Sequence, residues 1–266
     1  MSAIQKLLPQ LKALRLSGIL DTIEIRNQQA VEQKLSHLDF LALVLNDEFE
    51  RRENKKLHHR LRKANFGNDR TLENFRFDVP GLSINKAQIF DIATCLFIEE
   101  RVNVLIVGPT GVGKSHLAQA IGHQACRQGY DVLCCPFYKT MAQLRGSRAD
   151  GSYDRRIQAL LRPDLLILDD FGLKPLAPPA DEDFYELVSE RYERGSIVLT
   201  SNLDLAEWGG VFPNPVLGAA TADRLRHQAH RVVIEGDSFR SPRPQVADAT
   251  KPNGLPNKRA KTQAKE

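Results

Sequence analysis

The sequence has little that would place it in or across a membrane. A run of about 18 apolar residues, close to the shortest that spans a bilayer as a helix, does not occur in its 266 residues. Residues 1–15 also lack the uninterrupted apolar stretch and small-residue cleavage site of a secretory signal. From these two absences we expect a cytoplasmic protein that makes no membrane contact.

Cysteine is scarce, and the four cysteines lack the spacing of a metal site. Cys95, Cys126, Cys134 and Cys135 form no C-x-x-C pairs and have no histidines at metal-ligand intervals. We expect them to be reduced residues of the core. Zinc-finger spacing and the aromatic motif of RNA-binding domains are missing too, so base-specific reading of nucleic acid is not expected.

The formal net charge of +4 is modest but unevenly distributed. Residues 1–70 carry thirteen Lys and Arg against nine Asp and Glu, and residues 241–266 carry six against two. Both ends are therefore basic and the middle is slightly acidic. The chain is longer than one typical domain and has no internal repeat, so we expect an α/β core over 71–240 after a small helical domain over 1–70.

Residues 1–70 have the apolar spacing of helices. Large apolar residues recur three and four positions apart in two series: Ile4, Leu7, Leu8, Leu11 and Leu14, then Leu38, Leu41, Leu45 and Phe49. Ser36 precedes the second series, and its spacing to Asp39 predicts a capping box. A linker over 72–85 and a helix over 86–100 should follow.

From residue 102 onward, short β-rich apolar runs alternate with helical stretches, which is typical of a parallel sheet with crossover helices. Strands are predicted at 104–107, 132–137, 165–169, 197–201 and 231–234. Helices between them are predicted at 115–128, 140–145, 181–194 and 220–229. The basic tail, 241–266, is rich in proline and poor in apolar residues, so we expect it to be disordered.

The eight residues after the first predicted strand fit the phosphate-loop pattern G-x-x-x-x-G-K-[ST]. They are Gly108, Pro109, Thr110, Gly111, Val112, Gly113, Lys114 and Ser115. The glycines let successive backbone amides turn inward and form an anion site at the start of a helix. Lys114 then places a cation on the β- and γ-phosphates, and Ser115 offers a hydroxyl to Mg²⁺. The loop therefore predicts a nucleoside triphosphate site.

Two acidic residues end the third predicted strand. The apolar run 165–168 leads into Asp169 and Asp170, the pattern of a Walker B element. We expect Asp169 to hold Mg²⁺ and Asp170 to activate the attacking water. Asn202 follows the next strand and is predicted to hold the same water, although such a residue is also typical of a turn or a helix cap.

The segment 51–63 holds seven Lys or Arg and one Glu. At helical spacing its basic side chains share one face, while Leu57 and Leu61 point largely the other way. The predicted DNA-binding residues are Arg52, Lys55, Lys56, Arg60 and Lys63. Because a phosphate backbone favours such a face through counterion release, we expect mostly sequence-independent binding of duplex DNA. A solvated face without a partner is the alternative.

Taken together, the motifs resemble those of the IstB family, the ATPase helper proteins of insertion-sequence transposases. The residues that carry the resemblance are GPTGVGKSHLAQAIG (108–122), LLILDDFG (165–172), LTSN (199–202), ADRL (222–225) and GDSFR (236–240). That family is related to DnaC-type helicase loaders, within the initiator branch of AAA+ ATPases. The resemblance implies an AAA+ P-loop core with a five-stranded parallel sheet flanked by helices.

The resemblance also assigns two arginines and two cofactors. It implies ATP and Mg²⁺, with Arg224 as an arginine finger that reaches the ATP of an adjacent subunit and Arg240 as a second sensor of the γ-phosphate. Two departures from the general AAA+ pattern occur. Asp170 replaces the usual Glu, which predicts slow intrinsic hydrolysis, and only the polar tail follows Arg240, so we expect no full helical lid.

The resemblance therefore implies a DNA-stimulated ATPase that multimerises on duplex target DNA, with ATP at its subunit interfaces, and delivers that DNA to a partner transposase. A replicative helicase loader of the DnaC type is the nearest alternative. A small-molecule kinase, and an architectural DNA-binding protein that only retains nucleotide, are further alternatives.

Overall fold

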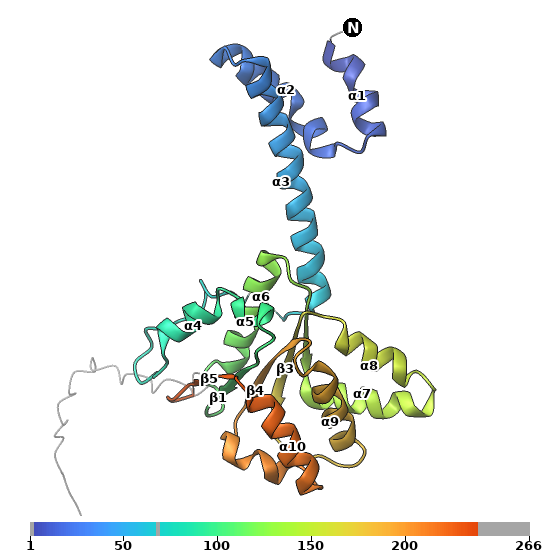
Figure 1. The fold of residues 1–266 in the computed structure, drawn as a ribbon. Coiled ribbons are helices and arrows are strands. Elements are labelled where there is room, and N and C mark those ends of the chain that lie inside the picture. The colour runs from blue at the N-terminus through green and yellow to red at the C-terminus, as the bar shows by residue number, and fades with distance from the viewer. Residues whose placement is uncertain (1–2, 68–69, 239–266) are drawn as a thin grey trace, which may run out of the picture.

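A computed structural model describes residues 3–67 and 70–238. Three helices come first: α1 (Ala3–Ala13), α2 (Ser17–Gln33) and α3 (His37–Ala64). The rest of the described chain forms an α/β body, from which α3 projects as a long stem with α1 and α2 near its far end (Figure 1). Within these residues, no helix combines the length and the apolar content that crossing a bilayer requires.

The helix α3 begins where the sequence predicts a cap. The Ser36 hydroxyl oxygen accepts a hydrogen bond from the Asp39 amide at 3.2 Å, which satisfies one of the open amides of the first turn. The Asp39 carboxylate accepts a hydrogen bond from the same hydroxyl at 2.6 Å. In a full capping box the acidic side chain accepts from the backbone amide of the N-cap residue instead. The predicted cap is therefore confirmed, but with a different contact for its acid.

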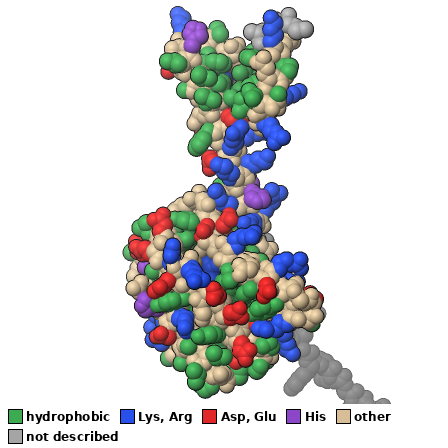
Figure 2. Space-filling model, turned by 45° about the vertical axis from the view of Figure 1, so that its right-hand side comes forward, with side chains coloured by type: hydrophobic (Ala, Val, Ile, Leu, Met, Phe, Trp, Pro, Cys, Tyr) green, Lys and Arg blue, Asp and Glu red, His purple; other side chains and the backbone are tan. Residues whose placement is uncertain are grey.

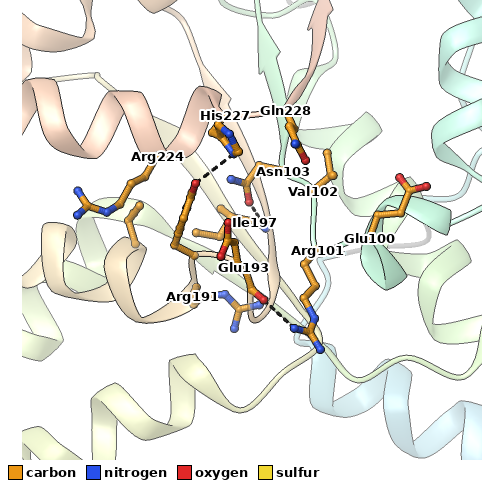
Figure 3. A pocket seen from close by; sticks show the side chains of 12 residues that line it. Glu100, Arg101, Val102, Asn103, Arg191, Glu193, Ile197, Arg224, His227 and Gln228 are labelled. Atoms are coloured by element: carbon orange, nitrogen blue, oxygen red, sulfur yellow. Dashed lines mark hydrogen bonds between the residues drawn. The ribbon is translucent and has the colours of Figure 1, made fainter.

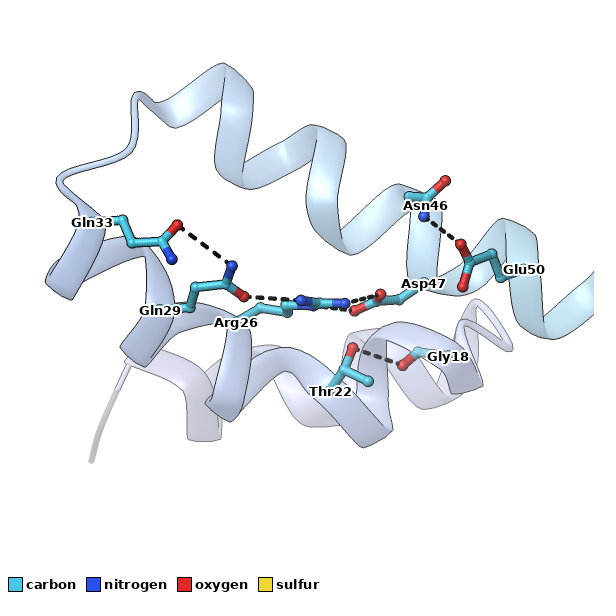
Figure 4. Close-up of polar contacts among 8 residues, drawn as sticks. All are labelled: Gly18, Thr22, Arg26, Gln29, Gln33, Asn46, Asp47 and Glu50. Carbon is cyan, nitrogen blue, oxygen red and sulfur yellow. Dashed lines mark hydrogen bonds and ion pairs between the residues drawn. The ribbon is translucent and has the colours of Figure 1, made fainter.

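The helices α2 and α3 pack through a small apolar cluster and an ion pair. Ile19, Ile23 and Val44 are buried between them. Arg26 binds both carboxylate oxygens of Asp47, at 2.8 and 2.7 Å (Figure 4), and this hydrogen-bonded guanidinium lowers the pKa of Asp47. A two-point contact of this kind fixes direction as well as distance, so it orients α2 on the stem.

The second apolar series of the sequence faces solvent. Leu38, Leu41, Leu45 and Phe49 are 77, 49, 51 and 63% exposed. Their spacing correctly predicts a helix, but the face of α3 that packs on α2 is the one with Val44. Periodicity reveals the helix, whereas tertiary contacts decide which face of it finds a partner.

The helix predicted over 86–100 is in fact two helices, α4 (Lys86–Ile92) and α5 (Leu96–Glu99). Cys95 between them has a φ of 61°, a left-handed conformation that interrupts a right-handed helix. The Thr94 hydroxyl donates to the Asp91 carbonyl oxygen at 2.7 Å, and local bonds of this kind compete with helix continuation. The prediction of one helix is therefore wrong.

Five parallel strands form one sheet, as predicted. They are β1 (Val104–Val107), β2 (Val132–Pro136), β3 (Leu165–Phe171), β4 (Ser196–Ser201) and β5 (His230–Val233). Their order across the sheet is β2-β3-β4-β1-β5, and every neighbouring pair is parallel. The prediction of a five-stranded parallel sheet is confirmed.

The connections contain more helix than predicted. They are α6 (Lys114–Gln128), α7 (Phe137–Ala149), α8 (Tyr153–Leu161), α9 (Ala180–Arg191), the 3₁₀ helix η1 (Leu205–Val211) and α10 (Pro215–Arg226). The predicted helix over 140–145 is only the middle of α7, and α8 has no counterpart in the prediction. The nine residues of α8 do have apolar side chains at helical spacing, Tyr153, Ile157, Leu160 and Leu161, so this helix could have been predicted from the sequence.

Alternating strand residues face two apolar layers. Val104 and Ile106 pack with α6 on one side, where Leu57 and Leu61 of α3 also contact the core. Leu105 faces the other side, which is covered by α7 to α10. The end of the stem is thus part of the α/β body, and the expected opposition between its leucines and its basic face is confirmed.

The cysteines are free thiols. Three are buried, and the half-buried Cys135 packs against the core, so the expectation of reduced core residues is confirmed. Burial raises the pKa of Cys95 to about 11 and the pKa of Cys134 to about 12. These thiols are protonated at neutral pH, and this state makes them poor nucleophiles.

Candidate active site

The carboxyl ends of β1, β3 and β4 lie at one edge of the sheet, because these strands are parallel neighbours. The phosphate loop follows β1, the two aspartates lie near the end of β3, and Asn202 follows β4. A cavity of about 370 Å³ lies at this edge. It is lined by Arg70, Thr110, Gly111, Gly113, Lys114, Ser115, His116, Asp170, Leu173 and Asn202.

The loop backbone has the form of an anion site. Gly111 and Gly113 have φ angles of 89° and 99°, which glycine adopts at little cost. A Cβ on Gly111 would lie 2.1 Å from the Ser238 hydroxyl oxygen. Gly113 is the N-cap of α6, so the open amides of that helix belong to residues that line the cavity.

Lys114 is charged yet only 5% exposed. Its Nζ donates to the carbonyl oxygens of Gly108 and Pro109, at 2.8 and 2.7 Å. These bonds compensate the ammonium for lost water and keep it inside the loop. Val112 is fully buried. Gly108, Pro109 and Val112 therefore shape the loop, and their neighbours supply its cavity lining.

Thr200 of β4 connects the two aspartates. Its hydroxyl donates to Asp169 Oδ1 at 2.6 Å and accepts from the Asp170 amide at 2.9 Å. Asp170 has a φ of 64°, at the point where the register between β3 and β4 shifts. Such irregularities re-aim side chains, and Asp170 lines the cavity. No sequence motif gives Thr200 a role, because its contact with Asp169 depends on the pairing of β4 with β3.

The turn after β4 is held by Ser201. Its hydroxyl donates to the Phe171 carbonyl oxygen at 3.0 Å and accepts from the Leu203 amide at 3.1 Å. Asn202 between these contacts shares the cavity lining with Asp170. This placement suits the predicted joint hold on a water molecule, and that role stays a prediction.

A magnesium site would depend on the nucleotide. The described residues include no cluster of three or more His, Cys, Asp and Glu side chains that would hold a metal by themselves. Mg²⁺ commonly uses one or two protein oxygens together with phosphate oxygens and water. Ser115 lines the cavity, and Asp169 lies in β3 next to Asp170 but outside the lining; a hydroxyl and a carboxylate oxygen are ligands that fit the ion.

Arg224 lies at the opposite edge of the sheet. The carbonyl oxygen of Leu225 accepts a hydrogen bond at 3.3 Å from Asn103, which directly precedes β1. Because β1 has four residues, about 13 Å of strand separates this edge from the phosphate loop. Arg224 lines a different cavity, of about 290 Å³ (Figure 3). The chain therefore does not bring Arg224 to its own loop.

Two contacts hold the Arg224 side chain. Its guanidinium carbon lies 5.1 Å from the centroid of the Tyr185 ring, and Nη1 donates to the Ala220 carbonyl oxygen at 3.2 Å. The hydrogen bond uses one of five guanidinium donors. Arg240 and the tail, 241–266, lie outside the described residues, so the second sensor, the disordered tail and the missing lid stay predictions.

The predicted DNA contacts lie on the stem of α3, where basic side chains gather (Figure 2). Arg60 is half-buried and the other four are exposed. A groove of about 460 Å³ is lined by Arg52, Lys55, Lys56, His59, Arg60, Arg62 and Asp131. Of the five predicted residues, Lys63 is outside this lining, and it pairs with Asp131 at 2.8 Å.

Acidic partners neutralise part of the stem. Lys56 pairs with Glu53 at 2.7 Å, and Arg52 pairs with Glu48 at 2.6 Å. Glu48 is buried and also accepts a hydrogen bond from the Gly18 amide at 2.6 Å. Arg52 therefore helps to hold the packing of α2 on α3, a structural role that the basic pattern does not reveal.

The chain matches a family model described as IstB-like ATP binding protein over residues 9–247. It is 38% identical over 235 residues to a protein of Mycobacterium tuberculosis named as an ATP-binding protein in an insertion sequence, with 86% of this chain and 92% of that protein covered. It is 34% identical over 257 residues to a protein of Pseudomonas aeruginosa named as an ATP-binding protein of insertion sequence IS21, with 96% and 95% covered.

Solved structures of similar fold include DnaI, with a TM-score of 0.54 and 20% identity over 62% of this chain and 90% of that chain. The replication initiator DnaA bound to AMPPCP and single-stranded DNA has a TM-score of 0.52 and 23% identity, over 64% and 51%. At such identities the likeness shows the AAA+ fold alone.

Fold, phosphate loop and relatives agree on the nucleotide. The carboxyl-edge cavity contains the loop residues expected to bind phosphate, and the relatives of high coverage are named as ATP-binding proteins. The chain is therefore an ATP-binding protein with an AAA+ fold and a phosphate loop. It belongs to the IstB family of insertion-sequence ATP-binding proteins.

Proposed function

We propose that this ATPase assembles on duplex DNA when ATP bridges neighbouring subunits, and that it delivers target DNA to a partner transposase. The observation that carries the proposal is the position of Arg224 across the sheet from the phosphate loop of its own chain. In an assembly, Arg224 completes the site of the next subunit. Arginines supplied in this way raise phosphoryl-transfer rates by about 10³ to 10⁵.

Within one subunit, the proposed chemistry uses the carboxyl edge of the sheet. Lys114 exchanges its two carbonyl contacts for phosphate oxygens. Asp170 and Asn202 hold a water whose oxygen attacks the γ-phosphorus; Asp170 accepts its proton, and the bond to the bridging oxygen breaks to release ADP. Ser115 and Asp169 would hold Mg²⁺, which when bound would supply positive charge for the phosphate oxygens.

The groove on the stem supplies the DNA contacts in this proposal. Each phosphate that a basic residue neutralises contributes about −0.9 to the slope of log affinity against log salt concentration. Lys55 and Arg60 line the groove and take part in none of the ion pairs found among the described residues. Alanine at either is therefore expected to change the slope by about one, and alanine at the paired Lys56 by less.

A subunit-mixing experiment tests the shared site. The Lys114→Ala and Arg224→Ala proteins are each expected to lack ATPase activity on duplex DNA. A mixture of the two should regain activity, because the intact loop of one variant meets the intact arginine of the other. Loss in both single variants without recovery in the mixture would contradict the proposal.

Assembly and partner choice are tested separately. The mass of complexes on duplex DNA should be larger with ATP than with ADP, and the Lys114→Ala protein should show no such difference. Pull-down experiments with the transposase and with a replicative helicase then separate delivery from helicase loading. Capture of the helicase alone would favour the loader alternative and contradict delivery.

A further inference from the structure

Arg70 is a second basic residue of the phosphate cavity, and it belongs to none of the sequence motifs. It shares the cavity lining with Lys114, Ser115 and Asp170, and it is half-buried. None of the ion pairs formed by the described residues includes Arg70. A guanidinium that is partly withdrawn from water and lacks an anionic partner is stabilised when a phosphate reaches it.

Arg70 comes from a segment that follows α6 toward the phosphate loop. We call this segment the strap; its described residues are 65–67 and 70–73. The Phe66 ring stacks on His123, with centroids 6.2 Å apart. The Thr71 carbonyl oxygen lies 3.2 Å from His116 Nε2, next to the start of α6. Phe66 therefore lies against the middle of α6, and Thr71 lies against the end of α6 that opens the phosphate site.

Both ends of the strap are anchored. On one side it continues α3, whose last residue, Ala64, is fully buried in the core. On the other side Glu73 accepts a hydrogen bond from Arg127 at 2.5 Å, which lowers the pKa of Glu73 to about 2. Thr71 between these points is also buried. Arg70 thus directly precedes a buried, hydrogen-bonded residue, an arrangement that reduces the entropy lost when a ligand binds.

We infer that Arg70 binds the phosphate chain of ATP in its own subunit, and that the strap thereby connects the nucleotide to the basic stem of α3. This inference rests on the proposed function, because it requires ATP in the carboxyl-edge cavity. Lys114 offers a compact ammonium, whereas Arg70 adds a planar fork that fits two phosphate oxygens. Arg70 serves the site in cis, and Arg224 serves it from the neighbouring subunit.

The connection has a thermodynamic consequence. ATP contacts the strap through Arg70, and DNA contacts α3, which leads into the strap. When one ligand changes the affinity for another, the second changes the affinity for the first by the same factor. Duplex DNA should therefore raise the ATP affinity of the unaltered chain more than that of an Arg70→Ala variant.

Calorimetry with the full chain tests the assignment of Arg70. Arg70→Ala is expected to weaken binding of ATP and of inorganic tripolyphosphate by a similar factor, on the order of tenfold or more. Arg70→Lys should recover part of the loss. Arg76→Ala is the matched control, because Arg76 is exposed and lies outside the cavity lining. Thermal unfolding without nucleotide should be alike in all these proteins.

Each contrary result has a separate meaning. Unchanged affinity of Arg70→Ala for both ligands would overturn the inference and leave the proposed function standing. Loss of ATP binding with unchanged tripolyphosphate binding would also overturn it, since Arg70 would then contact the nucleoside. An equal gain from DNA in both proteins would overturn the link to α3. If the unaltered chain binds neither ligand, the proposed function fails as well.

Discussion

The two edges of the sheet treat their arginines in opposite ways. At the carboxyl edge, Arg70 is half-buried in a cavity lining and takes part in no ion pair among the described residues. At the amino edge, Arg191 is 2% exposed and donates five hydrogen bonds to backbone carbonyl oxygens. Burial of an arginine therefore does not make a site; what matters is whether the protein already uses its donors.

Arg191 joins three parts of the chain at the amino edge. Its guanidinium nitrogens lie 2.9 to 3.1 Å from the carbonyl oxygens of Leu160, Leu161, Pro163, Asp164 and Ser196. Burial lowers the pKa of Arg191 to about 10, which still leaves it protonated at neutral pH. Arg224 lines the same amino-edge cavity and donates a hydrogen bond to the Ala220 carbonyl oxygen. One arginine of this edge is structural, and the other is the proposed finger.

Replacing Arg224 should have the largest effect, and it should change ATP turnover without changing stability. Arg224→Ala is expected to lower ATP turnover on duplex DNA by about 10³-fold, with an unchanged thermal midpoint, because its proposed partner is the neighbouring subunit's phosphate. Phosphate release at saturating ATP measures the effect. Arg226→Ala, an exposed neighbour on α10, is the control. A lower midpoint with unchanged turnover would make Arg224 structural instead.

Replacing Arg191 should show the reverse pattern. Arg191→Met is expected to lower the free energy of unfolding by about 3 kcal/mol, because five carbonyl oxygens lose the guanidinium donor and three of these hydrogen bonds are buried. Urea denaturation measures this loss. Arg194→Ala, which removes an exposed pair with Glu190, should change stability by no more than about 0.5 kcal/mol. Equal stability of the two variants would contradict the structural role of Arg191.

Thr200 allows a smaller test at the carboxyl edge. Thr200→Val keeps the shape but removes the donor to Asp169 and the acceptor for the Asp170 amide. Turnover is expected to fall about tenfold, equivalent to about 1.4 kcal/mol, while ATP affinity changes little. Steady-state hydrolysis and nucleotide titration separate the two quantities, and Thr200→Ser should retain activity. A Thr200→Val protein with full turnover would show that the two aspartates need no such support.

The sequence predicts the carboxyl edge better than the amino edge, and the reason is physical. A phosphate loop and strand-ending acids are local patterns, because their chemistry depends on consecutive amides and on the end of one strand. Arg191 is invisible to such patterns, since its partners are backbone carbonyls. Arg70 reaches the loop only because the strap follows α6, and Thr200 meets Asp169 only through the pairing of β3 with β4.

The exposed face of α3 likewise shows that local spacing does not predict tertiary contacts. Leu38 and Leu41 have the spacing of buried residues, yet 77 and 49% of their surfaces are exposed. Spacing within one helix cannot say which face another helix will cover. The break at Cys95 is similar, because a left-handed residue there depends on the buried site that its side chain occupies.

The smallest expected effect concerns the anchor of the strap. The Arg127 hydrogen bond lowers the pKa of Glu73 from 4.5 to about 2, so the pair stabilises the fold above about pH 4.5 and loses this contribution as the pH falls toward 2. Because the Glu73 and Arg127 side chains are 61 and 38% exposed, the contribution of the pair to stability should stay below about 1 kcal/mol. Between about pH 5 and about pH 3, the thermal midpoint of the unaltered chain should therefore fall slightly more than that of Glu73→Gln. Equal falls would show that this pair does not hold the strap, and that Arg70 depends on Thr71 and Phe66 for its position.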